Sequence, residues 1–159
     1  MGNGKTIKSA HNPIIDGKLP HLKIDIHGNY PDIFFLPGDP ARVDYYGSKA
    51  DSFKVIGSNR EFKIGIGSYK GIRFGVCSTG IGGGSTEIAV VELAQLGAKT
   101  LLRVGGCGAL QEHINCGDFI VNSGVVRCGG TAEWYAYKEF PAVSDPKINN
   151  ALIKTLNET

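Results

Sequence analysis

The chain has 159 residues, of which 42% are hydrophobic and 20% charged, with a formal net charge of +2. This composition indicates a soluble globular domain, and the lack of a basic block argues against a nucleic-acid partner. No stretch approaches the length of a membrane span, and the four cysteines show neither C-x-x-C pairing nor metal-ligand spacing. We therefore expect a cytoplasmic protein with small-molecule ligands and no membrane association.

The amino-terminal residues 1–20 are polar, with Gly and Pro scattered among them. They predict an arm rather than part of the core, so the domain is expected to cover residues 21–159. His21 follows in P-H-L-K-I-D, and by itself it is most simply a surface residue.

A buried strand is predicted at residues 33–36, ending in P-G-D-P-A-R. Asp39 is a good N-cap and Pro40 a good first helical residue, which places Gly38 where a strand leads into a helix. A helix N-terminus offers free N–H groups to an anion. The positive charge of Arg42 is unfavourable beside the positive end of the helix dipole. Either an anion lies between Arg42 and the helix N-terminus, or the arginine is simply exposed.

The alternating residues 53–77 predict an antiparallel strand pair around a turn at 69–71. N-R-E-F occupies residues 59–62 of this segment, and its Arg60 and Glu61 could form a surface ion pair worth little in stability.

The glycine-rich turn C-S-T-G-I-G-G-G-S-T follows the strand I-R-F-G-V-C. Glycines at positions 80 and 82–84 permit close approach of the backbone to a ligand such as an anion, or simply to a neighbouring element. A buried helix is predicted next, with Ser85 as N-cap and Gly97 as its stop. Arg103 then ends an apolar strand just before a second glycine-rich turn, where it needs an anionic partner.

Two common nucleotide-binding motifs do not fit this turn. A dinucleotide fingerprint needs glycine at position 85 and an acidic residue about 20 positions later, and the chain has neither. A P-loop needs a lysine that Gly84-Ser85-Thr86 does not supply.

Beyond residue 110, D-F-I-V-N and G-V-V-R-C predict two further strands, and Asp145-Pro146 predicts the start of a helix. No strand follows that helix, which suggests that the sheet is incomplete.

Six segments taken together resemble the nucleoside phosphorylase family, and within it the uridine phosphorylases: L-P-G-D-P-A-R, S-N-R-E-F, C-S-T-G-I-G-G-G-S-T, V-E-L-A-Q-L-G-A, L-R-V-G-G-C-G-A and E-F-P-A-V-S-D. The resemblance implies an α/β fold of three layers, α/β/α, with a mixed central sheet, here truncated at its carboxyl end. It implies a transferase of nucleoside catabolism and pyrimidine salvage, which converts a nucleoside and phosphate reversibly to the free base and ribose 1-phosphate. Homodimers or dimer-based hexamers are typical of the family.

The same resemblance implies roles for individual residues. Phosphate would be bound by Gly38, Arg42, Arg103 and Gly106, with Arg60 reaching in from a second copy. His21, also from the adjacent subunit, would contact the ribose, with Cys107 and Gly108 beside the nucleoside. No cofactor is expected beyond phosphate as co-substrate, except for an optional potassium ion. Its site would lie at the dimer interface, at Glu61, Ile81 and Ser85.

Some positions depart from the family pattern. Gly106 stands where family members often carry a hydroxyl residue, and G-G-C-G-A leans toward the bacterial purine nucleoside phosphorylases. The family's base-recognition loop and Met-Glu ribose-binding segment would follow residue 159, so the catalytic groups are expected outside this sequence. The alternatives are therefore an enzyme for purine nucleosides, and a non-catalytic remnant that binds phosphate or associates with a full-length homologue.

Overall fold

The computed structural model describes residues 13–128 and 130–158, and the chain divides into two compact units at Gly105/Gly106. Each unit is described by itself. Over the described ranges, no helix has the length and apolar character needed to cross a membrane.

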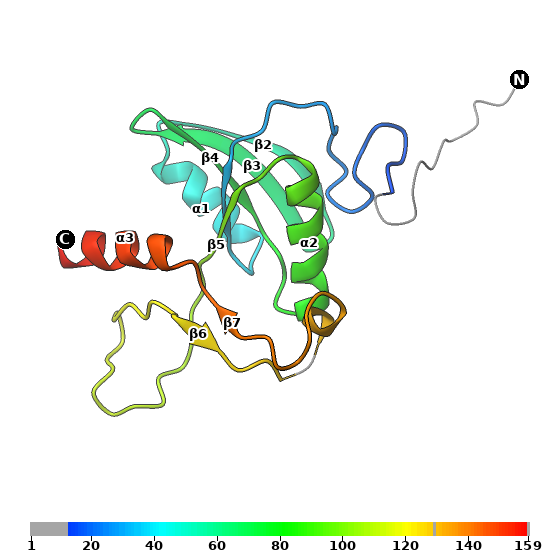
Figure 1. Cartoon of the computed structure of the whole chain (residues 1–159). Helices are drawn as coiled ribbons and strands as arrows, with labels where there is room; N and C mark the ends of the chain where they lie inside the picture. Colours follow the sequence, from blue (N-terminus) through cyan, green and yellow to red (C-terminus); the bar gives the residue numbers. More distant parts are fainter. Residues whose placement is uncertain (1–12, 129, 159) are drawn as a thin grey trace, which may run out of the picture. The chain divides into compact units, whose positions relative to one another are not determined.

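The first unit is built on a five-stranded sheet with the order β2-β3-β4-β1-β5 (Figure 1). Strand β1 pairs in parallel with both β4 and β5, whereas β2, β3 and β4 form antiparallel pairs, so the sheet is mixed. The strands are β1 (Ile33–Leu36), β2 (Ser52–Asn59), β3 (Phe62–Tyr69), β4 (Ile72–Cys77) and β5 (Thr100–Arg103).

Helices α1 (Ala41–Lys49) and α2 (Gly83–Gln95) cover opposite faces of this sheet (Figure 1). Successive strand residues point to opposite faces. Accordingly, Phe34 packs in a core cluster with Leu93 of α2, and its neighbour Phe35 packs in a second cluster with Val43 of α1. The three-layer α/β/α fold and its mixed sheet are confirmed.

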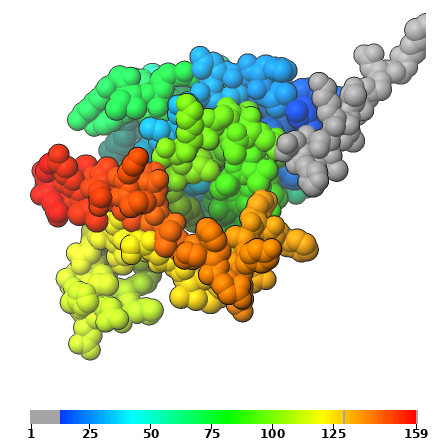
Figure 2. Space-filling view, in the orientation of Figure 1, coloured from blue at the N-terminus to red at the C-terminus, as the bar shows by residue number. Residues whose placement is uncertain are grey.

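The packed core begins earlier in the chain than predicted. Leu19 is fully buried in the cluster beneath α2, together with Leu22 and Ile24. An apolar leucine within the polar segment is thus part of the core, because burial removes its side chain from water. Residues 1–12 of the predicted arm lie outside the described residues. In the space-filling view, the blue to green residues form one packed body (Figure 2).

The predicted antiparallel pair is confirmed as β3 and β4. Lys70 and Gly71 connect these strands with φ of 49° and 78°, the left-handed conformation that two-residue hairpin turns require. Strands β2 and β3 form a second hairpin, in which Arg60 has φ 54°.

Helix α2 begins two residues before the predicted N-cap. Its N-cap is Gly82, and the Ser85 hydroxyl donates back to the Gly82 carbonyl at 3.1 Å instead of capping the helix. The predicted stop is confirmed, since Gly97 has φ 90° directly after the last turn.

The second unit contains a two-stranded sheet and one long helix. Residues 118–122 do not form the predicted strand, because an extended segment needs a neighbour to pair with and Phe119 is exposed. The predicted cap is confirmed, as the Asp145 carboxylate accepts from the N–H groups of Lys147 and Ile148 at 2.8 and 3.1 Å. The elements are β6 (Gly124–Val125), the 3₁₀ helix η1 (Thr131–Trp134), β7 (Ala142–Val143) and α3 (Pro146–Asn157).

Candidate functional site

The loop after β1 leads into α1 as the sequence predicts. The Asp39 carboxylate accepts from the N–H of Ala41 at 2.9 Å, and Pro40 already has helical dihedrals. The N–H of Arg42 donates to the Asp39 carbonyl at 3.1 Å. These first-turn donors are therefore occupied, and an anion at this helix end has to be held by other groups.

Gly38, immediately before this cap, offers one such group. Its carbonyl accepts from the N–H of Gly80 at 3.0 Å, whereas its own N–H has no hydrogen-bond partner within the part of the chain that the structure describes. The same contact joins the loop after β1 to the glycine turn after β4. Gly80 has φ 68°, so this turn uses the left-handed conformation that glycine adopts readily.

Arg103 reaches the same place from β5. It lies opposite Leu36 in the parallel ladder, and its Nη1 donates to the carbonyls of Leu36 and Val104 at 3.0 and 3.1 Å. A methyl group on Gly38 would stand 3.2 Å from Arg103 Nη2. The guanidinium is thus anchored at one nitrogen while the other lies beside Gly38, at the carboxyl ends of three adjacent parallel strands.

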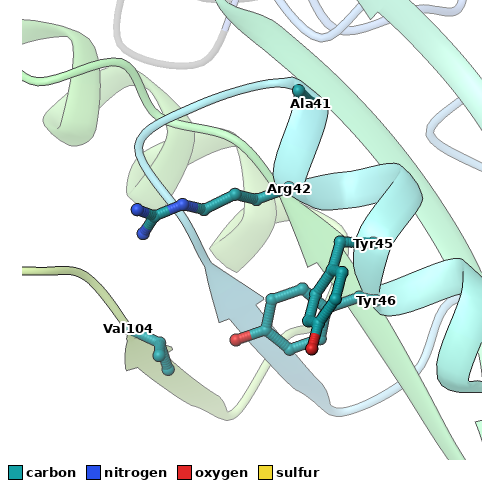
Figure 3. A pocket seen from close by; sticks show the side chains of 5 residues that line it. All are labelled: Ala41, Arg42, Tyr45, Tyr46 and Val104. Atoms are coloured by element: carbon teal, nitrogen blue, oxygen red, sulfur yellow. The ribbon is translucent and has the colours of Figure 1, made fainter. Parts of the chain in front are cut away.

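Arg42 projects into an open pocket of about 470 Å³ (Figure 3). Tyr45 and Tyr46 of α1 line the pocket with it, and Val104, the residue after Arg103, lies across from them (Figure 3). Burial raises the pKa of the Tyr46 phenol above its usual 10.0, while the positive charge of Arg42 opposes that rise. The pocket therefore combines one guanidinium with apolar and aromatic walls.

Glu61 and Ser85 meet at the glycine turn. A methyl group on Gly80 would stand 3.0 Å from the Ser85 hydroxyl and 3.3 Å from Glu61 Cγ. The neighbouring Ile81 is 99% exposed. Among the described residues, no three His, Cys, Asp or Glu side chains are grouped to hold a metal.

Four further predicted residues are exposed within their own units. Arg60 is exposed at the tip of the β2–β3 hairpin. Gly106, Cys107 and Gly108 are exposed residues of the second unit. The structure thus brings Gly38 and Arg103 together, and Glu61 and Ser85 together.

Sequence reasoning missed the role of Glu92. This buried residue of α2 contacts His21 through Oε1, 2.6 Å from the imidazole Nδ1. The one available signal was that Glu92 interrupts the apolar run I-A-V-V-E-L-A, because a buried charge needs a partner.

The chain belongs to the phosphorylase superfamily, whose sequence profile matches residues 32–159. The recognition made from the sequence motifs is thereby confirmed.

Relatives with named activities support the same placement. The chain is 45% identical to uridine phosphorylase of Escherichia coli over 83% of its own length and 51% of the relative's. It is 45% identical to uridine phosphorylase of Thermococcus kodakarensis (80% and 46% of the two lengths) and 44% identical to guanosine phosphorylase of Halorubrum lacusprofundi (80% and 53%). The chain thus spans about half the length of the curated relatives it matches.

A solved structure confirms the fold. The crystal structure of uridine phosphorylase from Vibrio fischeri superposes with a TM-score of 0.86 at 34% sequence identity. The match covers 91% of this chain and 60% of that one.

Proposed function

We propose that this chain provides the phosphate-binding part of a nucleoside phosphorylase. The reaction is the reversible conversion of uridine or a related nucleoside, with phosphate, to the free base and ribose 1-phosphate. The observation that carries the proposal is the meeting of Arg103 and Gly38 at the carboxyl ends of β1 and β5, where ligands bind in open α/β sheets. The names of the relatives give the reaction class.

The chemistry of phosphorolysis suits these groups. The nucleophile is a phosphate oxygen, which forms a bond to C1′ of the ribose as the glycosidic bond breaks and the base leaves with the electron pair. Guanidinium groups bind phosphate in a planar, two-pronged manner, which fixes the nucleophile beneath the sugar. Arg103 and Arg42 supply the charge, and Gly38 supplies a backbone N–H.

A second copy of the chain contributes to each site in this proposal. Arg60 stands at an exposed hairpin tip, free to reach a neighbour's phosphate, and His21 reaches the neighbour's ribose. The assembly would be a homodimer or a hexamer of such dimers. Cys107 and Gly108 would lie beside the nucleoside.

A potassium ion would be bound near Gly80. The carboxylate of Glu61, the hydroxyl of Ser85 and the main-chain carbonyl of Ile81 would hold it, since hard cations prefer oxygen ligands. The ion would supply positive charge that stabilises the dimer interface.

Uridine is the first candidate substrate and a purine nucleoside the second. Relatives with both kinds of name match this chain at nearly the same identity, 45% for uridine and 44% for guanosine phosphorylase. An assay of the protein with each nucleoside, with and without phosphate, would separate them by the base released.

The test of the proposal is phosphate-dependent release of base. In a protein that also carries the base-recognition loop and Met-Glu segment of the family, we expect ribose 1-phosphate and free base in equal amounts, and no turnover without phosphate. Calorimetry with inorganic phosphate provides the second measurement. Phosphate binding without turnover would instead support the non-catalytic alternative, and absence of phosphate binding in folded protein would refute both.

Shared sites can be tested by complementation. In a complete enzyme, the two variants Arg60→Ala and Arg103→Ala would each be inactive alone. Mixed dimers contain one site that carries neither substitution, so mixing should restore part of the activity. No recovery in confirmed mixed dimers would contradict the role of Arg60 across an interface.

A further inference from the structure

Glu92 is a charged residue buried beneath the chain segment that carries His21. Its side chain is 5% exposed, and both of its oxygens are used. Oε2 accepts from the N–H of Leu22 at 2.8 Å, and Oε1 accepts from the N–H of His21 at 3.0 Å. Oε1 also lies 2.6 Å from His21 Nδ1.

This arrangement determines where the imidazole carries its proton. An ionised carboxylate is only an acceptor, and the two backbone N–H groups are fixed donors that already point at it. The ring nitrogen 2.6 Å from Oε1 therefore has to be a donor as well, because two acceptors at that distance would repel each other. A neutral imidazole with its proton on Nδ1 leaves Nε2 with an unshared electron pair.

The rest of the surroundings fix the ring in place. The Asn59 side-chain amide donates to the His21 carbonyl at 2.7 Å. The imidazole packs edge-on against the Phe62 ring, with 6.4 Å between the ring centroids. The His21 side chain is nevertheless 40% exposed. The backbone and one side of the ring are thus held by the fold, while part of the ring is open to a ligand.

We infer that Glu92 is a positioning residue, which holds His21 as the Nδ1–H tautomer so that Nε2 accepts a hydrogen bond from a ligand hydroxyl group. The inference about the tautomer stands on the contacts of this chain alone. Identifying the hydroxyl as one of a nucleoside's ribose rests on the proposed function.

The direct test is nitrogen NMR of the full chain with ¹⁵N-labelled histidine near neutral pH. The chain has four histidines, and the signals absent from a His21→Asn variant assign His21. We expect the proton on Nδ1 and an unprotonated Nε2 in the unaltered protein. A proton on Nε2 together with an unprotonated Nδ1 would overturn the inference. This outcome can be read from the unaltered protein alone.

Glu92→Gln tests the cause. A carboxamide has one acceptor oxygen and a donor NH₂ group, which cannot satisfy three donors. We expect the Nε2–H tautomer to gain population in this variant, while Glu112→Gln, an exposed control in the second unit, leaves it unchanged. A folded Glu92→Gln protein with the original tautomer would contradict the positioning role and leave Glu92 as a purely structural contact.

Kinetics separate this inference from the proposed function. In a phosphorolytic enzyme, Glu92→Gln should raise KM for the nucleoside about tenfold and leave KM for phosphate within about twofold, since only the hydroxyl contact is disturbed. A parallel rise in both constants would contradict selective positioning. If the folded, unaltered protein binds no phosphate, the proposed function fails, whereas the tautomer is still decided by the NMR experiment.

Discussion

Arg103 Nη2 lies so close to Gly38 that a methyl group there would stand 3.2 Å from it, and the same methyl would stand 3.2 Å from the Gly80 carbonyl oxygen. The close approach selects glycine at this position, because any side chain would push apart the loops after β1 and β4 or displace the guanidinium.

Gly38→Ala is expected to weaken phosphate binding more than it weakens the fold. The neighbouring groups have to move by a few tenths of an ångström, which misaligns the guanidinium fork with its anion. We expect about tenfold weaker binding of inorganic phosphate by calorimetry, or about 1.4 kcal/mol. The matched control is Gly124→Ala in the second unit, where the added methyl would meet its nearest neighbour at an ordinary 3.4 Å. Equal affinities of the two variants for phosphate would contradict a phosphate site at Gly38.

Arg103→Lys keeps the positive charge but loses the planar fork. A lysine cannot donate to the carbonyls of Leu36 and Val104 and also present a second nitrogen beside Gly38. We expect a loss of phosphate affinity of about tenfold or more, read from the phosphate-induced rise in Tm. Arg73→Lys, which alters an arginine bonded to Asn29, serves as the control and should retain the phosphate effect. Full phosphate affinity in Arg103→Lys would exclude a role for the fork.

Cys77 should resist thiol reagents in the folded protein. Its side chain is buried, whereas Cys107, Cys116 and Cys128 are exposed. Because the thiolate is the reactive form and burial disfavours it, native protein should lose three thiols to an aromatic disulfide reagent and the fourth only after unfolding. Mass spectrometry of the labelled peptides checks this, and rapid labelling of Cys77 in folded protein would contradict the packing of β4 described above.

The same thiol makes the stability depend on pH. Burial, and secondarily the charge of Glu92, raises the pKa of Cys77 from 9.0 to about 12. Above pH 9 the unfolded chain releases this proton while the folded chain keeps it, so the free energy of unfolding falls as the pH rises from about 9 toward 12. Urea melts of Cys77→Ala should show a smaller loss over this window than the unaltered chain. Cys116→Ala, an exposed control, should behave like the unaltered chain.

Gly75→Ala is expected to be strongly destabilising. Gly75 lies opposite Phe34 in the β1–β4 ladder, and an added methyl would come within 2.1 Å of the phenyl ring. Overpacking of this kind costs about 1–3 kcal/mol in the free energy of unfolding. In the double variant with Phe34→Leu, the smaller side chain makes room for the added methyl group. The double variant should therefore lose less free energy of unfolding than the two single variants added together. Strict additivity in urea melts would show that the clash is relieved elsewhere.

The sequence was sufficient to predict part of the five-stranded sheet, although not the separate strand β2. The strand ending before Gly38, the strand ending in Arg103 and the turn at 69–71 each carry local signals, namely apolar runs, turn glycines and a capping aspartate. The family resemblance implied that Gly38 and Arg103 share a site, and the ends of parallel strands at one edge of a sheet agree with that placement.

Other features depend on partners far away in the chain. Glu92 binds the backbone of His21 and Leu22 about 70 positions earlier, and no local pattern indicates that pairing. The burial of Leu19 likewise depends on distant residues, since a single leucine in a polar segment does not indicate which surface it packs against. Residues 118–122 had strand propensity, but propensity forms a strand only where a neighbouring strand accepts its hydrogen bonds.

Phe53 fills the space above two glycines that belong to different elements. A methyl on Gly47 of α1 would come within 2.6 Å of its ring, and a methyl on Gly65 of β3 within 2.3 Å. The Phe53 ring therefore limits how closely α1, the helix that carries Arg42, can approach the β2–β3 hairpin. Over evolutionary time these three positions should change together. Sequences with a smaller residue at 53 should be the ones that tolerate alanine or serine at 47 and 65, a coupling that sequence comparison across the superfamily can detect.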